Sequence, residues 1–439
     1  MFSYPLVKFL RENGEKVDHR LRQKLLHIYK PFKWVPCFFH NIYGRFIDKM
    51  KKVSVIIEFK DGMCTHGIGE VDKLLSAHSR CKVRHHFTRV SCCSADVTPH
   101  AMKEMLNKCS SIKKVYLNRE VKALLDTAVP ASHAENVVRN DTVLTGSGVT
   151  VAVIDTGIHP HEDLLGRITG FADFIDGRTQ AYDDNGHGTH VAGAVAGNGR
   201  SAGGEYQGPA PEANVIGVKV LNKTGAGSLE TVMQGVDWCI SYNERNPDRP
   251  INIINLSLGS PAQRFDQEED DPLVKIVNAA WDRGIVVCAA AGNDGPSTQT
   301  IASPGLSGKI ITVGALDNRN SVEREDDDVA SFSSRGPTIY GKTKPDLLAP
   351  GVEIISLRSP NSYLDKLQKQ RRVGEAYISM SGTSMATPIC AGVCALYLQH
   401  HPEDTPEQVK RALMRGTDLW RDRYPNIYGA GYINAEKTI

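Results

Sequence analysis

Asp155 is the first of three side chains whose types suit nucleophilic catalysis, and it directly follows an apolar run, residues 148–154. A carboxylate at the end of a buried strand is costly unless hydrogen-bond donors meet it. It can therefore cap the following loop or orient a second side chain. Asp155-Thr-Gly is also the signature of aspartic proteases, but those enzymes need a second carboxylate to share a proton. Because the chain contains a single Asp-Thr-Gly, we exclude that mechanism.

His187 lies between two glycines in the segment Asp184-Asn-Gly-His-Gly-Thr-His190. The glycines leave the backbone uncrowded, and a helix over residues 187–196 would begin at this histidine. It is either a structural histidine or one that projects into a cleft. A zincin-type metal pair needs two histidines four residues apart with a glutamate between them. His187 and His190 are three residues apart without one, which argues against metal binding.

Ser384 lies in a polar turn, residues 379–388, that leads into an apolar helix over 389–398. The free N–H groups and the positive dipole end of a helix N-terminus stabilise developing negative charge. A simple N-cap is the alternative role for such a serine. Asn293 follows a predicted buried strand, residues 285–290, where its side-chain amide could serve as an oxyanion donor.

Together, in the chain order Asp, His, Ser, these segments resemble the three signatures of the subtilase serine proteases. The likeness rests on Asp155-Thr-Gly, His187-Gly-Thr-His and Gly382-Thr-Ser-Met-Ala-Thr-Pro388, and it covers about residues 145–439. Residues 53–125 are similar to a subtilase propeptide. We recognise no signal peptide in the sequence, and residues 29–34 read Tyr-Lys-Pro-Phe-Lys-Trp. Both features make the chain most similar to the AprX-type intracellular serine proteases.

The resemblance implies a role for each matching residue. Ser384 would be the nucleophile, His187 would move its proton, and Asp155 would hold the imidazole. Asn293 and the Ser384 N–H would bind the oxyanion. Extended substrate would pair with two segments, and small residues would line a pocket for a large apolar P1 side chain. These substrate-binding residues are Gly225, Ala226, Gly227, Ser257, Leu258 and Gly259 for the strands, and Ala289, Ala290 and Ala291 for the pocket.

The strands and helices that must position these residues indicate an α/β fold. Apolar runs at 148–154, 214–220, 251–258, 285–290 and 310–313 alternate with helical stretches at 187–196, 228–243 and 271–283. Strands alternating with helices predict a doubly wound, mostly parallel sheet covered on both faces. In such sheets the carboxyl ends of the strands build the site.

Residues 53–125 show the order β-α-β-β-α-β, which predicts an α+β, ferredoxin-like unit. We therefore divide the chain into a basic N-terminal extension (1–52), a propeptide or inhibitor-like domain (53–125), a linker (126–144) and a catalytic domain (145–439). We expect residues 121–125 to lie extended in the substrate cleft, with self-cleavage beginning in the linker.

The formal net charge of +2 is unevenly distributed. Residues 1–52 hold 12 Lys/Arg against 4 Asp/Glu, residues 53–125 hold 12 against 7, and residues 126–439 hold 28 against 39. This uneven charge either serves solubility or allows the basic residues 1–125 to dock on the acidic residues 126–439.

The small net charge of the whole chain predicts no nucleic-acid partner. No run of 18 apolar residues is present, which predicts no membrane partner. Ten Cys without Cys-x-x-Cys predict reduced thiols and a cytoplasmic location.

We expect no required cofactor, and calcium is left open. Subtilisins hold calcium through a loop that here is residues 197–208 and lacks the family's ligand pattern. Asp163 matches one ligand, whereas calcium takes six to eight oxygens. The acidic insert at 323–328 is a second candidate, with a solvated loop as its alternative.

Two readings of function stay open. The first is a serine endopeptidase made as an autoinhibited precursor, whose partners are polypeptide substrates and its own propeptide. The second is a non-catalytic peptide-binding relative of the same fold. A dinucleotide-binding enzyme is excluded because no Gly-x-Gly-x-x-Gly follows the first buried strand.

Overall fold

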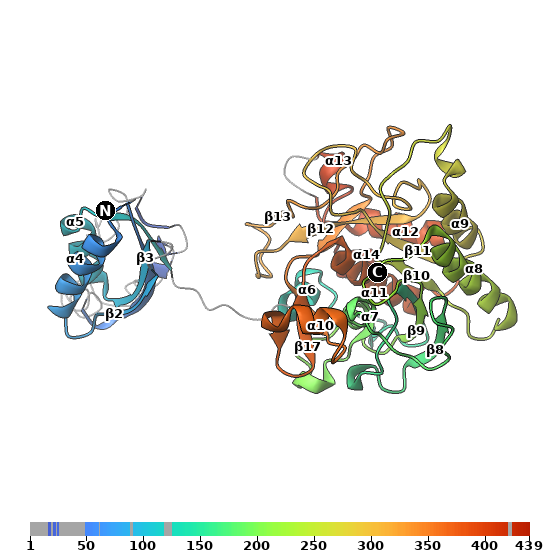
Figure 1. Ribbon diagram of the computed structural model, residues 1–439, viewed down its shortest axis with the longest axis horizontal. Helices are drawn as coiled ribbons and strands as arrows, with labels where there is room; N and C mark the ends of the chain where they lie inside the picture. The colour runs from blue at the N-terminus through green and yellow to red at the C-terminus, as the bar shows by residue number, and fades with distance from the viewer. Residues whose placement is uncertain are drawn as a thin grey trace. The chain divides into compact units, whose positions relative to one another are not determined.

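The computed structural model describes residues 16–18, 21–22, 24–25, 49–60, 62–87, 91–117, 125–419 and 424–439. The chain divides into two compact units, Met1–Val121 and Lys122–Ile439 (Figure 1). Within the described part of the chain, no helix combines the length and apolar character needed to cross a membrane.

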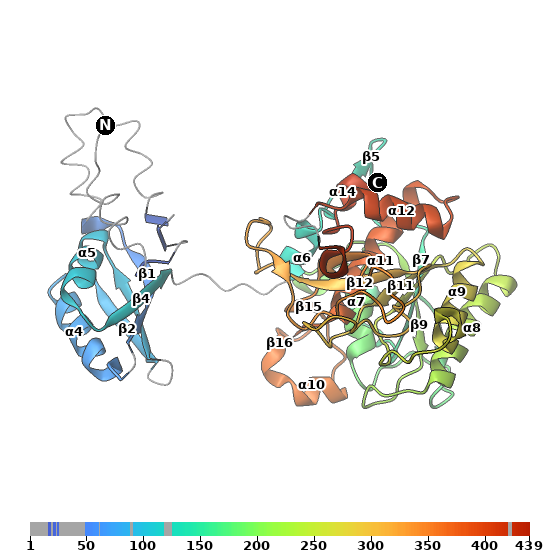
Figure 2. The ribbon, with the colours of Figure 1, turned by 90° about the horizontal axis from the view of Figure 1, so that it is seen from above.

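The first unit is a four-stranded antiparallel sheet with two helices on one face (Figure 2). The strand order is β2-β3-β1-β4, as expected for the predicted ferredoxin-like pattern. Thr98 accepts a hydrogen bond from the Ala101 N–H and so caps the second helix. The elements are β1 (Val53–Phe59), α4 (Cys64–Ser76), β2 (Lys82–Phe87), β3 (Cys92–Val97), α5 (Pro99–Lys108) and β4 (Ile112–Leu117).

Part of the predicted basic extension belongs to this unit. Val17 forms a bridge with Val115 of β4, and Leu21 and Leu25 are fully buried in the same core. These apolar side chains belong to the core of the first unit. Most other residues of 1–52 lie outside the described residues.

The second unit is built on an eight-stranded sheet in the order β13-β12-β11-β10-β7-β9-β8, with β14 also paired to β12. All pairs are parallel except β12 with β13. The predicted doubly wound, mostly parallel fold is confirmed. The strands are β7 (Thr150–Asp155), β8 (Ile168–Asp173), β9 (Asn214–Lys219), β10 (Ile253–Leu256), β11 (Val286–Ala290), β12 (Ile311–Asp317), β13 (Asp328–Val329) and β14 (Leu347–Pro350).

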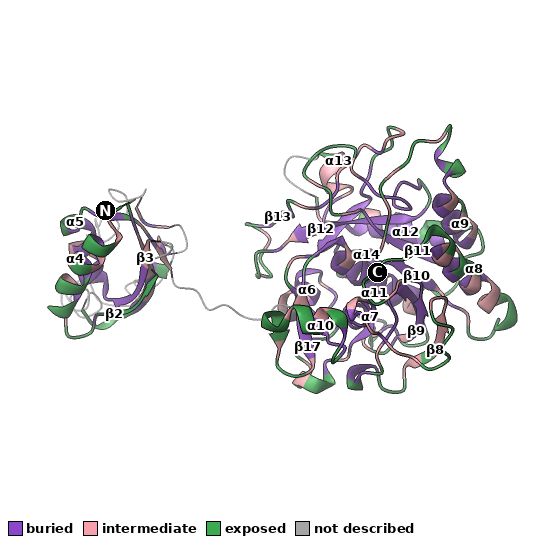
Figure 3. Cartoon of the chain, in the orientation of Figure 1, coloured by how far each residue is buried: buried purple, intermediate pink, exposed green. Residues whose placement is uncertain are grey.

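Long helices cover this sheet, whose central strands β7, β10 and β11 are buried along their whole length (Figure 3). Right-handed crossovers place α8 and α9 on one face, because they link β9 to β10 and β10 to β11. The helix α7, which links β8 to β9, packs on α11 instead, and these two helices cover the opposite face. These helices are α7 (His187–Ala196), α8 (Leu229–Arg245), α9 (Pro272–Trp281) and α11 (Thr383–His400).

Smaller elements complete the second unit. Antiparallel pairing joins β15 (Ile354–Leu357), β17 (Tyr377–Met380) and β16 (Arg372–Val373) into a small sheet. The remaining elements are β5 (Val138–Arg139), β6 (Thr142–Val143), α10 (Tyr363–Leu367), α12 (Pro406–Gly416), α13 (Pro425–Tyr428), α14 (Ala435–Thr438) and the 3₁₀ turns η4 (Glu162–Leu164), η5 (Arg200–Ala202), η6 (Glu268–Asp270) and η7 (Lys369–Arg371).

Residues 126–144, which the sequence presents as a linker, are part of the second unit. They contain most of α6 (Leu125–Ala131) together with β5 and β6. Ala128, Val129 and Leu144 are buried in the main core. Small apolar side chains suffice here because the helix lies close against that core. Of the segment 121–125, expected to be extended, residues 121–124 lie outside the described residues, and Leu125 begins α6 instead.

Candidate active site

The carboxyl end of β7 lies where the strand order diverges, with β9 on one side and β10 on the other. Asp155 ends β7 and is fully buried. Its Oδ1 accepts the Thr156 N–H at 2.7 Å and lies 2.7 Å from Nδ1 of His187. The buried carboxylate therefore meets donors, as its burial requires, and one of them is the predicted histidine.

His187 is the first residue of α7, and a glycine on each side permits its placement. Gly186 has a φ of 106°, in the left-handed region that favours glycine. A β-carbon at Gly188 would lie 2.2 Å from the Gly157 carbonyl oxygen, so only glycine allows the helix to approach the Asp155 loop. Asp183 Oδ1 accepts a hydrogen bond from the Gly186 N–H, and this bond stabilises the turn before the helix.

The acid–base properties of His187 follow from its surroundings. Burial lowers its pKa, but the charge of Asp155 and their hydrogen bond outweigh burial, so the pKa is raised above 6.5. Its side chain keeps 22% of its surface exposed, which leaves the ring accessible from the pocket. His190 differs: its Nε2 contacts the Ile354 carbonyl, and burial lowers its pKa to about 3. His190 is therefore a neutral core residue.

Ser384 lies in the first turn of α11 and is half-buried. The helix N-cap is Gly382, so the serine side chain does not serve as the cap. The Ser384 Oγ donates to the Ser257 carbonyl at 2.9 Å, and the Ser257 Oγ donates to the Ser384 carbonyl at 2.8 Å. These two bonds fix the start of α11 beside residues 257–259. The structure shows no hydrogen bond between Ser384 and His187.

Asn293 follows β11, and the start of α11 fixes the orientation of its amide. Its Oδ1 accepts from the backbone N–H of Thr383 at 2.9 Å and from the Thr383 Oγ at 3.0 Å. Its Nδ2 group is then left to face the space beside Gly382. A β-carbon added at Gly382 would lie 3.6 Å from the Ser384 N and 3.7 Å from the Asn293 Nδ2. Two N–H donors therefore border one small space.

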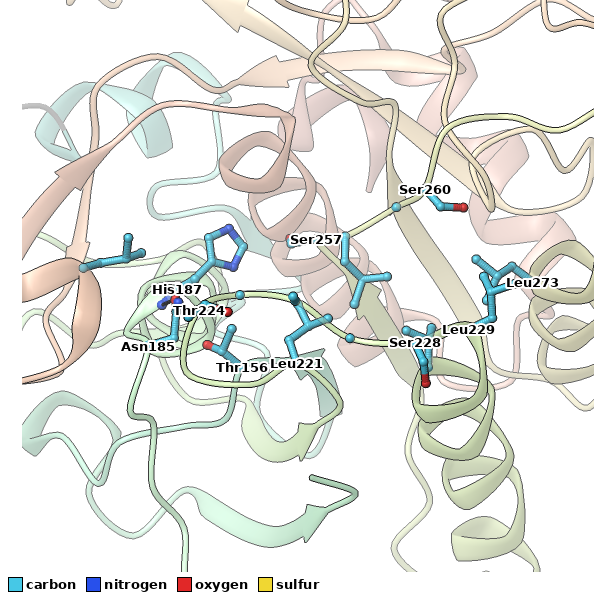
Figure 4. Close-up of a pocket in the computed structure, with 17 residues that line it drawn as sticks. Thr156, Asn185, His187, Leu221, Thr224, Ser228, Leu229, Ser257, Ser260 and Leu273 are labelled. Atoms are coloured by element: carbon cyan, nitrogen blue, oxygen red, sulfur yellow. Dashed lines mark hydrogen bonds between the residues drawn. The ribbon is translucent and has the colours of Figure 1, made fainter. Parts of the chain in front are cut away.

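A pocket of about 460 Å³ opens beside His187 (Figure 4). His187 and Asn185 lie toward one end, and Ser228, Leu229 and Leu273 lie toward the other. Six of the predicted substrate-binding residues line it together, namely Gly225, Ala226, Gly227, Ser257, Leu258 and Gly259. The two segments face one cavity although they lie about thirty residues apart in the sequence.

The predicted P1-pocket residues occupy a different place. Ala289 and Ala290 belong to β11, Ala291 follows it, and all three are buried. None of them lines the pocket of Figure 4. Ala291 packs instead with Val274 and Ile301. Their role in substrate selection stays a prediction.

Lys219 is a site residue that the sequence reasoning missed. It ends β9 with its side chain completely buried. Its Nζ donates to the Thr156 carbonyl at 2.6 Å, the Leu221 carbonyl at 2.8 Å and the Asp184 carboxylate at 2.9 Å. One ammonium thus joins the aspartate loop, the histidine loop and the start of the 221–227 segment. A lysine ending the apolar run Val215–Val218 was the available signal.

Comparisons with known proteins agree with this geometry. The sequence model of the subtilase family matches residues 146–431. Serine protease AprX of Bacillus subtilis (strain 168) is 61% identical over 439 residues, covering 100% of this chain and 99% of that protein. Subtilisin Savinase of Lederbergia lenta is 38% identical over 294 residues, covering 67% of this chain and 91% of that protein.

A solved structure supports the same assignment. The crystal structure of a cold adapted subtilisin-like serine proteinase has a TM-score of 0.52 with 30% sequence identity, covering 70% of this chain and 97% of that one. A family match over most of the second unit coincides with a buried carboxylate bonded to a histidine and with a serine in the first turn of a buried helix. The chain belongs to the subtilase family and is a subtilisin-like serine peptidase of the AprX type.

Proposed function

We propose that the chain is a serine endopeptidase that cleaves polypeptides through the triad Asp155, His187 and Ser384. The observation that carries this proposal is the 2.7 Å contact between Asp155 Oδ1 and His187 Nδ1 at the carboxyl edge of the sheet. This contact occupies Nδ1 with a proton and leaves Nε2 as the basic nitrogen. A histidine held in this way is suited to accept a proton from a serine.

The reaction uses the residues as follows. Rotation about the Cα–Cβ bond takes the Ser384 hydroxyl away from the Ser257 carbonyl, and His187 Nε2 accepts its proton as Oγ attacks the substrate carbonyl. Catalytic hydrogen bonds often tighten only when substrate is bound. The imidazolium, stabilised by Asp155, then protonates the departing amine and leaves an acyl-enzyme. Water activated by His187 releases the second product.

The oxyanion of the tetrahedral intermediate binds between the Ser384 N–H and the Asn293 Nδ2 group. Both donors border the same space beside Gly382. Thr383 holds the Asn293 amide by its oxygen, so the donor end is oriented before substrate arrives. Such preorganised donors stabilise charge as it develops in the transition state.

Substrate binds as an extended strand between residues 225–227 and residues 257–259, which line one pocket. Leucines 221, 229, 258 and 273 add apolar surface to that pocket. We therefore assign a preference for apolar side chains, with Ala289 to Ala291 as a further determinant at P1.

The first unit acts as an inhibitor that keeps the enzyme inactive until it is cut. The support is its predicted ferredoxin-like strand order and its basic charge against an acidic second unit. Opposite charges speed and strengthen such docking.

The enzyme works in the cytoplasm, which fits the free thiols of all nine described cysteines.

The residues at the subtilisin calcium position do not fit a metal. Asp163 Oδ1 accepts from the N–H and the Oγ of Ser201, at 2.9 and 2.6 Å, and its Oδ2 accepts from the Tyr377 hydroxyl at 2.7 Å. Protein donors therefore already use the one matching carboxylate. In the acidic insert 323–328, only Asp327 among the acidic residues is buried, and burial raises its pKa to about 7. Neither place supplies the oxygen ligands that calcium requires.

Replacement of Ser384 by alanine tests the nucleophile. We expect Ser384→Ala to lose peptide hydrolysis to background and to lose labelling by a fluorophosphonate, while the circular dichroism spectrum stays unchanged. Ser381→Ala, three residues earlier and exposed, is the matched control and should keep both. A folded Ser384→Ala protein with normal turnover would refute the triad, and a folded parent protein that takes no label would support the non-catalytic alternative.

The raised pKa of His187 sets a second expectation. Hydrolysis requires the neutral imidazole, so kcat/KM should rise with pH through the His187 pKa, with a midpoint above 6.5. Asp155→Asn removes the charge that raises this pKa, so it should lower the midpoint as well as kcat. Rate profiles between pH 5 and 9 measure both. A midpoint that is unaffected by Asp155→Asn would exclude the proposed pairing.

Asn293 gives a third test. Asn293→Ala should lower kcat by about 10²–10³, the loss typical of one oxyanion donor and known from subtilisin, with little change in KM. Steady-state kinetics on one peptide substrate, with Asp294→Ala as an exposed neighbouring control, separate the two parameters. If KM rose while kcat held, Asn293 would instead be a ground-state contact.

The inhibitor role is tested with the two units as separate chains. Residues 1–125 added to residues 126–439 should inhibit hydrolysis, and inhibition should tighten at low salt. Val55→Asp places a charge in the core of the first unit and should abolish inhibition if the folded unit is needed. An absence of inhibition and of assisted refolding at every salt concentration would show that the first unit is a permanent structural domain.

A further inference from the structure

Three cysteine side chains meet behind the active site, where the proposed reaction uses none of them. Cys288 belongs to β11, and Cys390 and Cys394 belong to α11. All three residues are fully buried. Their sulfur atoms all lie within 4.8 Å of one another, and the Cys288 and Cys394 Sγ atoms are 3.8 Å apart. Among the described residues, no other three His, Cys, Asp or Glu side chains come together in this way.

The secondary structure explains why the thiols converge. Cys390 and Cys394 are four residues apart on one helix, so both project from the same face. That face packs on β10, β11 and β12. Cys288 points from β11 toward α11, as its contact with Cys394 shows. Three sulfur donors from two rigid elements therefore enclose one point.

This donor set suits a soft metal ion. Thiolates favour Cu(I) and Zn²⁺ over the oxygen-seeking Mg²⁺ and Ca²⁺. Zn²⁺ in structural sites takes four ligands, and no fourth His, Cys, Asp or Glu joins this group in the described part of the chain. Metal–sulfur bonds of about 2.3 Å in a trigonal plane put the sulfurs about 4 Å apart, close to the observed spacing.

The number of sulfur donors selects among the soft ions. Three sulfur ligands complete a trigonal Cu(I) complex, whereas a structural Zn²⁺ ion would still lack a fourth ligand from the described part of the chain. Metal binding requires thiolates, so each thiol that the ion engages releases its proton to the buffer.

We propose that Cys288, Cys390 and Cys394 form a binding site for one Cu(I) ion, held by three sulfur atoms between β11 and α11.

Occupancy of the site also lowers catalysis, a consequence that rests on the proposed function. β11 leads to Asn293 five residues after Cys288, and α11 carries Ser384 six residues before Cys390. The two oxyanion donors therefore extend from the two elements that the metal joins. Drawing the sulfurs together shifts these donors, and a displacement of about 1 Å at a reacting centre can cost up to 10²-fold in rate.

Copper binding is tested on the reduced full-length chain without oxygen. Cu(I) is titrated in competition with bicinchoninate, and the protein is expected to retain one more equivalent than either Cys288→Val or Cys394→Ala. Cys239→Ala removes a buried cysteine of α8 that lies outside the cluster, and it should retain as much copper as the parent. X-ray absorption of the one-equivalent sample should show three sulfur neighbours.

Equal retention by the parent and by both folded cluster variants would overturn the site. Two variants are used so that misfolding of one does not decide the result, and each is checked by circular dichroism. This readout needs no catalytic activity, so the site can be judged even if the proposed function fails.

The catalytic consequence has its own measurement. One equivalent of Cu(I) is expected to lower kcat of the parent about tenfold with little change in KM. Cys288→Val should lose this inhibition, and Cys239→Ala should keep it. Inhibition that persists in Cys288→Val, or bound copper with unchanged kcat, would overturn the coupling to the oxyanion donors.

Discussion

The buried carboxylate of Asp155 is the constraint on which the arrangement of the site depends. A charge at the end of β7, fully removed from water, persists only if donors are delivered to it. The structure supplies the Thr156 N–H and His187 Nδ1, each at 2.7 Å. Meeting this requirement brings the start of α7 against the end of β7. Gly188 follows from that close approach, and Gly186 follows from the left-handed turn that precedes the helix.

Other strand-end loops are fixed to the same point by buried polar groups. Lys219 joins three of them through one ammonium, and Asp183 holds the turn before α7. Reciprocal bonds between Ser257 and Ser384 attach the start of α11 to β10. Such groups are expensive to bury unless every partner is in place, so they favour one arrangement of the loops. That arrangement is the preorganisation that a reaction with developing charge requires.

Two buried groups of side chains lie close to the site. Around Asp163, donors from Ser201 and Tyr377 take the positions that ligand coordination would otherwise use. Behind the site, three thiols face one another where ordinary apolar side chains would also fill the space. Both features lie on or against elements that carry the proposed catalytic residues. Changes in packing there can therefore reach the site without altering any of its side chains.

The sequence by itself determined the local elements and the chemistry they carry. Apolar runs such as residues 148–154 predicted the buried parallel strands, and the glycines around His187 predicted its place at a helix start. Family resemblance then assigned roles to Asp155, His187 and Ser384. These inferences work because they depend on neighbours along the chain and on the positions where strands end.

Tertiary structure alone decided what depends on contacts between distant segments. Residues 126–144 resemble a linker in composition, yet Ala128 and Val129 are buried because α6 packs on the main core. The apolar run at residues 215–218 does not reveal that Lys219, which follows it, donates hydrogen bonds to three partners in separate loops. Likewise, Cys288 is more than a hundred residues from Cys394, and only the packing of β11 on α11 brings their sulfurs together. Such contacts arise from how strands and helices are stacked, which local sequence patterns do not record.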